Sequence, residues 1–370
     1  MNTKRKTTAI LAAGFGILLA AGNGFLAFAD TVYVNATSLN YRTAPSTEAE
    51  LLGTLPKGTE LEREKNEGEW STVLINGTRC YVASCYLSAD KPAAGSGTAA
   101  SGGRAESAQA GAVDSPYVDK TWEVALDSKD TYASFSKISS GTAIYYQNGR
   151  ENRKGKTVCV NAGHGTKGGG SVKTQCHPDG SPKVTGGTTG AGAVTAAAVS
   201  SGMTFADGTP EHEVTLAMAK KLRDKLLAEG YDVLMIREGN DVQLDNIART
   251  VLANNHADCH IALHWDSTEK DKGCFYMSVP DNASYRAMEP VASHWQSHNR
   301  LGDCLIEGLK GKGNKIFSSG SIEMDLTQTS YSTVPSIDIE LGDKASPHSD
   351  ETLDKLADGL LDGVNQFFAP

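Results

Sequence analysis

The segment Thr157-Val-Cys-Val-Asn-Ala-Gly-His-Gly165 indicates the architecture of this 370-residue chain. Its first four residues suit a buried strand, and Gly163 and Gly165 supply the backbone freedom of a turn. In an open α/β sheet, functional sites collect beyond the carboxyl ends of the strands. The pattern therefore predicts that His164 is an exposed functional residue at the end of a buried strand.

The next predicted elements along the chain are a helix over residues 210–229 and a strand over 231–237. Pro210 suits the start of the helix and Gly230 its C-terminal cap. Glu211 and Glu213 lie in the first turn, where a carboxylate meets the positive end of the helix dipole, or can face a histidine at a neighbouring strand end. Apolar residues repeat every four positions on the buried face: Val214, Met218, Leu222 and Leu226.

A second helix is predicted over residues 242–254, followed by a strand over 258–264. His264 then lies at a carboxyl strand end, in a place equivalent to that of His164. We expect His256 to be a surface residue at the helix end and His260 to be a satisfied interior one.

The last predicted strand, residues 334–342, carries Glu340 near its end. Glu340 is either a functional acid on the same rim or a solvated edge carboxylate. An amphipathic helix is predicted to close the chain over residues 350–368. His294 and His298 share a helical face without the intervening glutamate of an HExxH motif, so we interpret them as exposed.

Two further segments flank these elements. Residues 117–155 contain two predicted strands, which we expect to form a lead-in hairpin or sheet edge. Residues 166–208 are rich in glycine and small residues, which argues against a conventional packed element. This insertion is either a lid or substrate wall beside the site, or a disordered insertion.

The N-terminal part of the chain has three segments of different character. Residues 1–29 resemble a secretory signal peptide, with a basic start, an apolar stretch and an Ala-x-Ala cleavage site before Asp30. Residues 30–88 alternate short strands with turns and predict a small all-β barrel. Residues 89–116 are mostly Ala, Gly and Ser, as in a flexible linker.

Composition excludes several classes of function. The net charge of −9 leaves no basic stripe for nucleic-acid phosphates. Beyond residues 1–29, no apolar run is long enough to cross a bilayer. The seven cysteines include no CxxC pair, which argues against a four-cysteine zinc site. Cys80 and Cys85 form the one locally plausible disulfide.

Imidazoles and carboxylates that meet at one edge of a sheet suit zinc binding and amide hydrolysis. Two histidines and one glutamate, with an open position for water, form a catalytic zinc site. A separate carboxylate can then move the proton during amide hydrolysis, and no organic cofactor is required.

Residues 30–88 resemble a bacterial SH3-like domain. The resemblance rests on LNYRTAPS (39–46), LGTLPKGTELE (52–62), GEWSTVLING (68–77) and CYVASCYLS (80–88). It implies a module that binds cell-wall glycan or peptide, and the alternative is a spacer barrel without a ligand.

From residue 156 onward the chain resembles the zinc-dependent N-acetylmuramoyl-L-alanine amidases of the Amidase_3 type. The matching segments are VCVNAGHG (158–165), EHEVTLAMAKKLRDKLLAEGYDVLMIR (211–237), IARTVLANNHADCHIALHWDS (247–267) and VPSIDIELG (334–342). The resemblance implies a mixed twisted sheet flanked by helices over residues 156–370. It also implies Zn²⁺ ligands at His164, Glu211 and His264, and a general acid/base at Glu340. The chain departs from the family pattern at Asn161, at Trp265-Asp266 and in the long insertion.

The function implied by the resemblance is that of an exported, wall-associated hydrolase. It would act on peptidoglycan and cleave the bond between N-acetylmuramic acid and the L-alanine of the stem peptide. One alternative is a zinc peptidase that cuts within the stem peptide. Another is a cell-wall-binding protein whose second domain is inactive.

Overall fold

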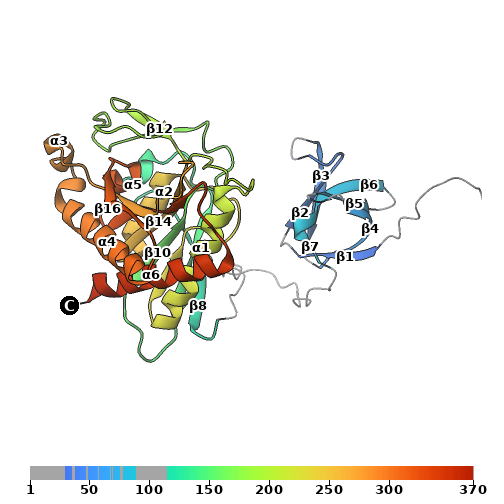
Figure 1. Ribbon diagram of the computed structural model, residues 1–370. Helices are drawn as coiled ribbons and strands as arrows, with labels where there is room; N and C mark the ends of the chain where they lie inside the picture. The colour runs from blue at the N-terminus through green and yellow to red at the C-terminus, as the bar shows by residue number, and fades with distance from the viewer. Residues whose placement is uncertain are drawn as a thin grey trace, which may run out of the picture. The chain divides into compact units, whose positions relative to one another are not determined.

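The computed structural model describes residues 115–369 and residues 30–88 apart from 36–37, 47–48, 57, 67, 69 and 76–77. The described residues fall into two compact units, one within residues 1–104 and one within 105–370 (Figure 1). The predicted signal peptide, 1–29, and nearly all of the predicted linker, 89–116, lie outside the described residues.

The first unit is an antiparallel all-β unit, as predicted. Its sheet has the order β3-β2-β6-β5-β4-β1-β7. The strands are β1 (Asp30–Val34), β2 (Ser38–Arg42), β3 (Leu51–Pro56), β4 (Glu60–Asn66), β5 (Trp70–Ile75), β6 (Thr78–Ala83) and β7 (Leu87–Ser88). Alternate residues such as Val32, Val34 and Val82 fill the core. Cys80 is a free, buried cysteine in this core, so the predicted disulfide with Cys85 was wrong.

The second unit is built on a mixed sheet with the order β16-β15-β17-β14-β10-β13-β9-β8. Its strands are β8 (Val118–Ala125), β9 (Thr142–Asn148), β10 (Thr157–Ala162), β13 (Asp232–Met235), β14 (Cys259–Asp266), β15 (Cys274–Ser278), β16 (Ile316–Glu323) and β17 (Ser336–Asp343). The central strands β13, β10, β14 and β17 run parallel. Antiparallel β9 and β8 form the predicted hairpin at one edge.

Helices cover both faces of this sheet, which confirms the predicted fold class. They are α1 (Glu211–Glu229), α2 (Asn246–His256), α3 (Ala283–Arg286), α4 (Val291–Gly311), α5 (Thr327–Tyr331) and α6 (Asp350–Phe368). Side chains of α1, α4 and α6 share one hydrophobic core with Val158 and Val160 of β10. Cys159, between them, points to the opposite face and packs with residues of α2. Because β10 alternates in this way between two apolar layers, it is buried along its whole length.

Two predictions about helices need correction. The second helix begins at Asn246 rather than at residue 242, because the Asp245 side chain caps it by accepting a hydrogen bond from the amide of Ala248 at 2.8 Å. His298 is fully buried rather than exposed, because its face of α4 lies against β17, where its Nδ1 accepts a hydrogen bond from the Ser336 amide at 2.9 Å.

The insertion over residues 166–208 contains a second, two-stranded sheet that its composition did not predict. Strands β11 (Lys173–Gln175) and β12 (Thr195–Ala197) pair antiparallel. Cys176, His177 and Val199 are buried. The insertion is therefore a folded part of the second unit.

Candidate metal and catalytic site

His164 follows the carboxyl end of β10 in a strained turn. Its φ is +61° and that of Gly165 is +70°, so two consecutive residues adopt the left-handed conformation. The predicted turn is therefore present. The predicted exposure was wrong, because His164 is only 8% exposed. Its Nδ1 donates a hydrogen bond to the carbonyl of Ser200, 2.9 Å away, which leaves Nε2 as the nitrogen with a free lone pair in the neutral ring.

Two buried arginines hold the backbone of this turn. Arg237 donates to the carbonyls of Ala162 and Gly163 at 3.0 and 2.9 Å. Arg249 donates to the carbonyl of His164 at 2.7 Å. Each guanidinium thus satisfies carbonyls that a left-handed turn removes from the sheet ladder. These bonds offset the strain of the turn and orient His164.

Glu211 begins α1 and is 2% exposed. Its Oε2 accepts a hydrogen bond from the amide of Met203 at 2.8 Å, and its Oε1 accepts one from the amide of Trp265 at 3.0 Å. Burial alone would raise the pKa of Glu211, but hydrogen bonds with His164 and His264 lower it below its ordinary value. Glu211 is therefore a carboxylate, and Oε1 is its atom nearest to both histidines.

His264 lies on β14 and brings the third donor to the same point. Its Nδ1 is 3.0 Å from His164 Nε2 and 3.3 Å from Glu211 Oε1. His164 Nε2 is 2.9 Å from the same Oε1. The structure thus brings together all three residues that the resemblance implies as metal ligands, and Glu213 is not part of the group.

This donor set fits a divalent zinc ion. Two imidazole nitrogens and one carboxylate oxygen converge on one point, and such a set with an open fourth position is typical of catalytic zinc. The electrostatic environment of His264 also suits a cation. Burial opposes its protonation, yet Asp338 and Glu211 raise its pKa to about 9. The site therefore concentrates negative charge that a cation would balance.

Glu340 lies on β17, beside His264 in the register of the parallel strands. It faces the same cavity as the three donor residues, and its Oε2 is buried without a hydrogen-bond partner among the described residues. Burial, together with nearby Asp338, raises the pKa of Glu340 well above its ordinary value. Glu340 is therefore an interior carboxyl group in the cavity rather than a solvated edge residue.

The cavity has a volume of about 590 Å³, and the insertion forms one of its walls. Residues 186–189 and 199–203 line it on the insertion side, opposite β14 and β17. The insertion also supplies the partners of two donor residues, Ser200 to His164 and Met203 to Glu211. Of the two interpretations of the insertion, the geometry agrees with a wall beside the site.

Sequence reasoning missed several contributors to the site, among them Asp338 and Ser200. Asp338 lies two residues before Glu340 on the same side of β17, and its Oδ2 is 3.6 Å from His264 Nε2. The alternation of Ile337 and Ile339 with acids was the available signal, since it places Asp338 and Glu340 on one face. No comparable signal identified Ser200, whose role depends on the course of the insertion.

The family model described as N-acetylmuramoyl-L-alanine amidase matches residues 158–366, and the bacterial SH3 domain model matches residues 37–88. Among solved structures, the chain is similar to the apo N-acetylmuramyl-L-alanine amidase of Mycobacterium abscessus, with 20% identity, a TM-score of 0.46, and coverage of 58% of this chain and 99% of that one. The corresponding amidase of Mycobacterium smegmatis has 21% identity, a TM-score of 0.45, and coverage of 59% and 98%. The curated proteins gave no match.

Proposed function

The chain belongs to the N-acetylmuramoyl-L-alanine amidase family, and from this premise we propose that it hydrolyses the amide bond between N-acetylmuramic acid and the L-alanine of the peptidoglycan stem peptide. The observation that carries the proposal is the convergence of His164, Glu211 and His264 beside Glu340 in one cavity. An amide hydrolase needs a group that activates water, a group that moves its proton, and space for both halves of the substrate.

His164 Nε2, Glu211 Oε1 and His264 Nδ1 would hold a zinc ion in this proposal. When bound, zinc polarises the scissile carbonyl and lowers the pKa of water. The insertion binds the remaining polar atoms of two of these residues. Ser200 binds the other nitrogen of His164, and Met203 binds the other oxygen of Glu211.

Glu340 is the proposed general acid/base. Its unpartnered Oε2 would accept a proton from the attacking water and deliver that proton to the nitrogen of L-alanine as the C–N bond breaks. The raised pKa of Glu340 suits a carboxylate that must hold the proton between these two steps. The products are the free carboxyl group of the muramic acid lactyl side chain and a stem peptide with a new L-alanine amino terminus.

The test is product analysis of purified peptidoglycan after digestion with the zinc-loaded protein. We expect stem peptides that begin with L-alanine, their loss with a chelator, and their return with added zinc. Shortened stems that remain on the glycan would support the peptidase alternative. Binding without any released fragment would support the inactive wall-binding alternative.

Glu340→Gln tests the acid/base assignment. We expect the variant to bind one zinc ion per chain and to lose about 10²–10⁴-fold in rate, since this is the usual contribution of a positioned acid/base. Glu323→Gln, at an exposed position of β16, is the matched control and should retain activity. Retained activity of Glu340→Gln would exclude Glu340 from this role.

Residues 1–88 lead us to propose export and wall association. Residues 1–29 carry the pattern of a secretory leader, and the bacterial SH3 model matches residues 37–88. Among the described residues, no helix has both the length and the apolar character needed to cross a membrane. Recovery of a wall-bound protein whose first residue is Asp30 would support this proposal, and retention of residues 1–29 would contradict it.

A further inference from the structure

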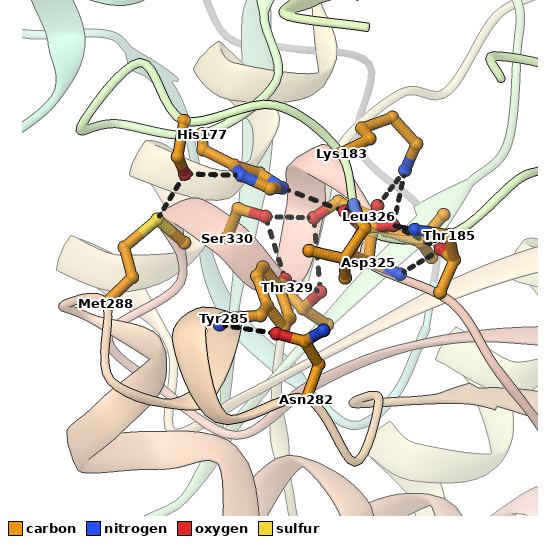
Figure 2. A network of polar contacts seen from close by, with 12 residues as sticks. His177, Lys183, Thr185, Asn282, Tyr285, Met288, Asp325, Leu326, Thr329 and Ser330 are labelled. Carbon is orange, nitrogen blue, oxygen red and sulfur yellow. Dashed lines mark hydrogen bonds and ion pairs between the residues drawn. The ribbon is translucent and has the colours of Figure 1, made fainter. Parts of the chain in front are cut away.

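One buried carboxylate of the second unit, Asp325, receives several hydrogen bonds from the insertion. This residue lies between β16 and α5 and is fully buried. Figure 2 shows His177, Lys183 and Thr185 of the insertion around Asp325. His177 Nε2 is 3.0 Å from Oδ2, and Lys183 Nζ is 2.9 Å from Oδ1. Both bonds join parts of the chain that are more than 140 residues apart.

Backbone groups complete the attachment. The amide of Val184 donates to Asp325 Oδ2 at 2.7 Å, and that of Thr185 donates to Oδ1 at 3.1 Å. The Thr185 hydroxyl also donates to Oδ1 and accepts from the Asp325 amide. Asp325 therefore receives donors from four residues of the insertion, three of them consecutive. Charge-assisted bonds of this kind are about twice as strong as neutral ones.

Asp325 is itself held firmly from the other side. The next residue, Leu326, accepts hydrogen bonds from the hydroxyls of Ser330 and Thr329 in α5, at 2.7 and 3.1 Å (Figure 2). The hydroxyl of Tyr285, in α3, lies 2.8 Å from that of Ser330. The anchor is thus continuous with the packed helices of the unit rather than with another loop.

The anchored residues lead directly into the cavity wall. Thr185 is followed by Gly186, Gly187, Thr188 and Thr189, which all line the cavity. Within the part of the chain that the structure describes, the amides of these four residues make no hydrogen bond to protein. A methyl group added at Gly186 would meet nothing within 4 Å. An extended peptide recognises such a stretch through main-chain hydrogen bonds.

We propose that Asp325 is a positioning residue that fixes residues 183–189 as a rigid wall of the cleft, and that residues 186–189 of this wall bind the extended stem peptide through their backbone. The inference rests on the proposed function, because it assigns the peptide half of that substrate to this wall. Pre-organisation by Asp325 removes the cost of ordering the loop when the peptide binds.

The test measures binding on the full-length, zinc-loaded Glu340→Gln background, so that the result does not depend on catalysis. Calorimetry with muramyl-pentapeptide and with muramyl-dipeptide is compared with and without Asp325→Asn. We expect Asp325→Asn to weaken pentapeptide binding roughly tenfold or more, since bonds to a charged group contribute that much. Dipeptide binding and zinc affinity should stay within about twofold of the parent.

Hydrogen exchange supplies a second readout. The amides of Val184 and Thr185 should exchange faster in Asp325→Asn, while those of the central strands stay protected. Thr185→Val removes only one hydroxyl from the anchor and is the milder variant if Asp325→Asn does not fold. Asp207→Asn is the matched control, because Asp207 is exposed in the same insertion and its carboxylate binds the Thr209 amide and His348, outside the anchor.

Three results would overturn the proposal. Unchanged pentapeptide binding in both anchor variants would show that the wall does not hold the peptide. Equal losses for pentapeptide and dipeptide would assign the wall to the muramic acid or the first two residues rather than to the extended stem. Unchanged exchange at Val184 would show that Asp325 does not fix the loop. Failure of the wild-type protein to cut peptidoglycan is a separate result that would contradict the proposed function.

Discussion

Gly163→Ala is the substitution whose effect the geometry defines most sharply. Gly163 lies between β10 and His164, and its φ does not require glycine. However, a methyl group at this position would lie 2.3 Å from Cε1 and 2.7 Å from Nδ1 of His264. Carbon atoms in contact are about 3.5–4.0 Å apart, so the imidazole ring must retreat by about 1 Å. Nδ1 is the atom that faces His164 and Glu211, so the donor set opens.

This displacement has three measurable consequences. Zinc affinity should fall about 10- to 100-fold, as when the support of a metal ligand is lost. The free energy of unfolding without metal should fall by about 1–3 kcal/mol, the usual cost of overpacking. Amide hydrolysis at saturating zinc should fall about 100-fold, since a misplacement of 1 Å has that effect.

The assay is zinc titration by calorimetry, with denaturant unfolding of the chelator-treated protein. Gly311→Ala is the matched control, because a methyl group at the end of α4 would meet nothing within 4 Å. That variant should keep its zinc affinity, and its free energy of unfolding should rise by up to about 1 kcal/mol. If Gly163→Ala bound zinc within twofold of the wild type and unfolded at the same denaturant concentration, the geometric argument would be refuted.

Three further predictions concern stability. Burial lowers the pKa of His260 and of His298 to about 3, so below pH 6.5 the unfolded chain binds more protons than the folded one. The free energy of unfolding, measured by denaturant titration from pH 7 to 4, should therefore fall by up to about 1.4 kcal/mol per pH unit for each histidine. If His298→Asn left the dependence of this free energy on pH unaltered, the prediction would be contradicted. Asp245→Ala should lower the free energy of unfolding, measured by urea titration, by more than about 3 kcal/mol. The reason is that the amides of Ala248, Lys137 and Ile138 all lose the carboxylate that accepts their hydrogen bonds. A loss below about 1 kcal/mol would count against this prediction. Zinc at 100 times its Kd should raise the free energy of unfolding by about 2.7 kcal/mol relative to the chelator-treated protein, as measured by thermal scans. An equal increase in Gly163→Ala at the same zinc concentration would contradict the ligand assignment.

The prediction of the second unit succeeded where short-range patterns carry the information. The apolar strand before Gly163 is β10, and the helix between Pro210 and Gly230 is α1, which ends on a left-handed glycine as expected. Parallel β10, β14 and β17 bring their carboxyl ends to one edge. The predicted start of α2 was wrong. The apolar pattern begins at residue 242, but the helix begins only after Asp245, whose side chain caps it.

Local spacing, glycine positions and residue chemistry in the sequence were enough to single out His164, His264 and Glu340, since each lies at or near the end of a strongly patterned strand. They left Glu211 and Glu213 both open, and only the family resemblance selected Glu211. The assignment of the ligands and of the acid/base remains a prediction. Only the tertiary structure revealed that His298 is buried, that Asp338 faces His264, and that the glycine-rich insertion is a folded wall. The physical reason is that these features depend on partners far apart in sequence. The bond between His177 and Asp325 joins residues 148 positions apart, and no periodicity within the insertion specifies that partner.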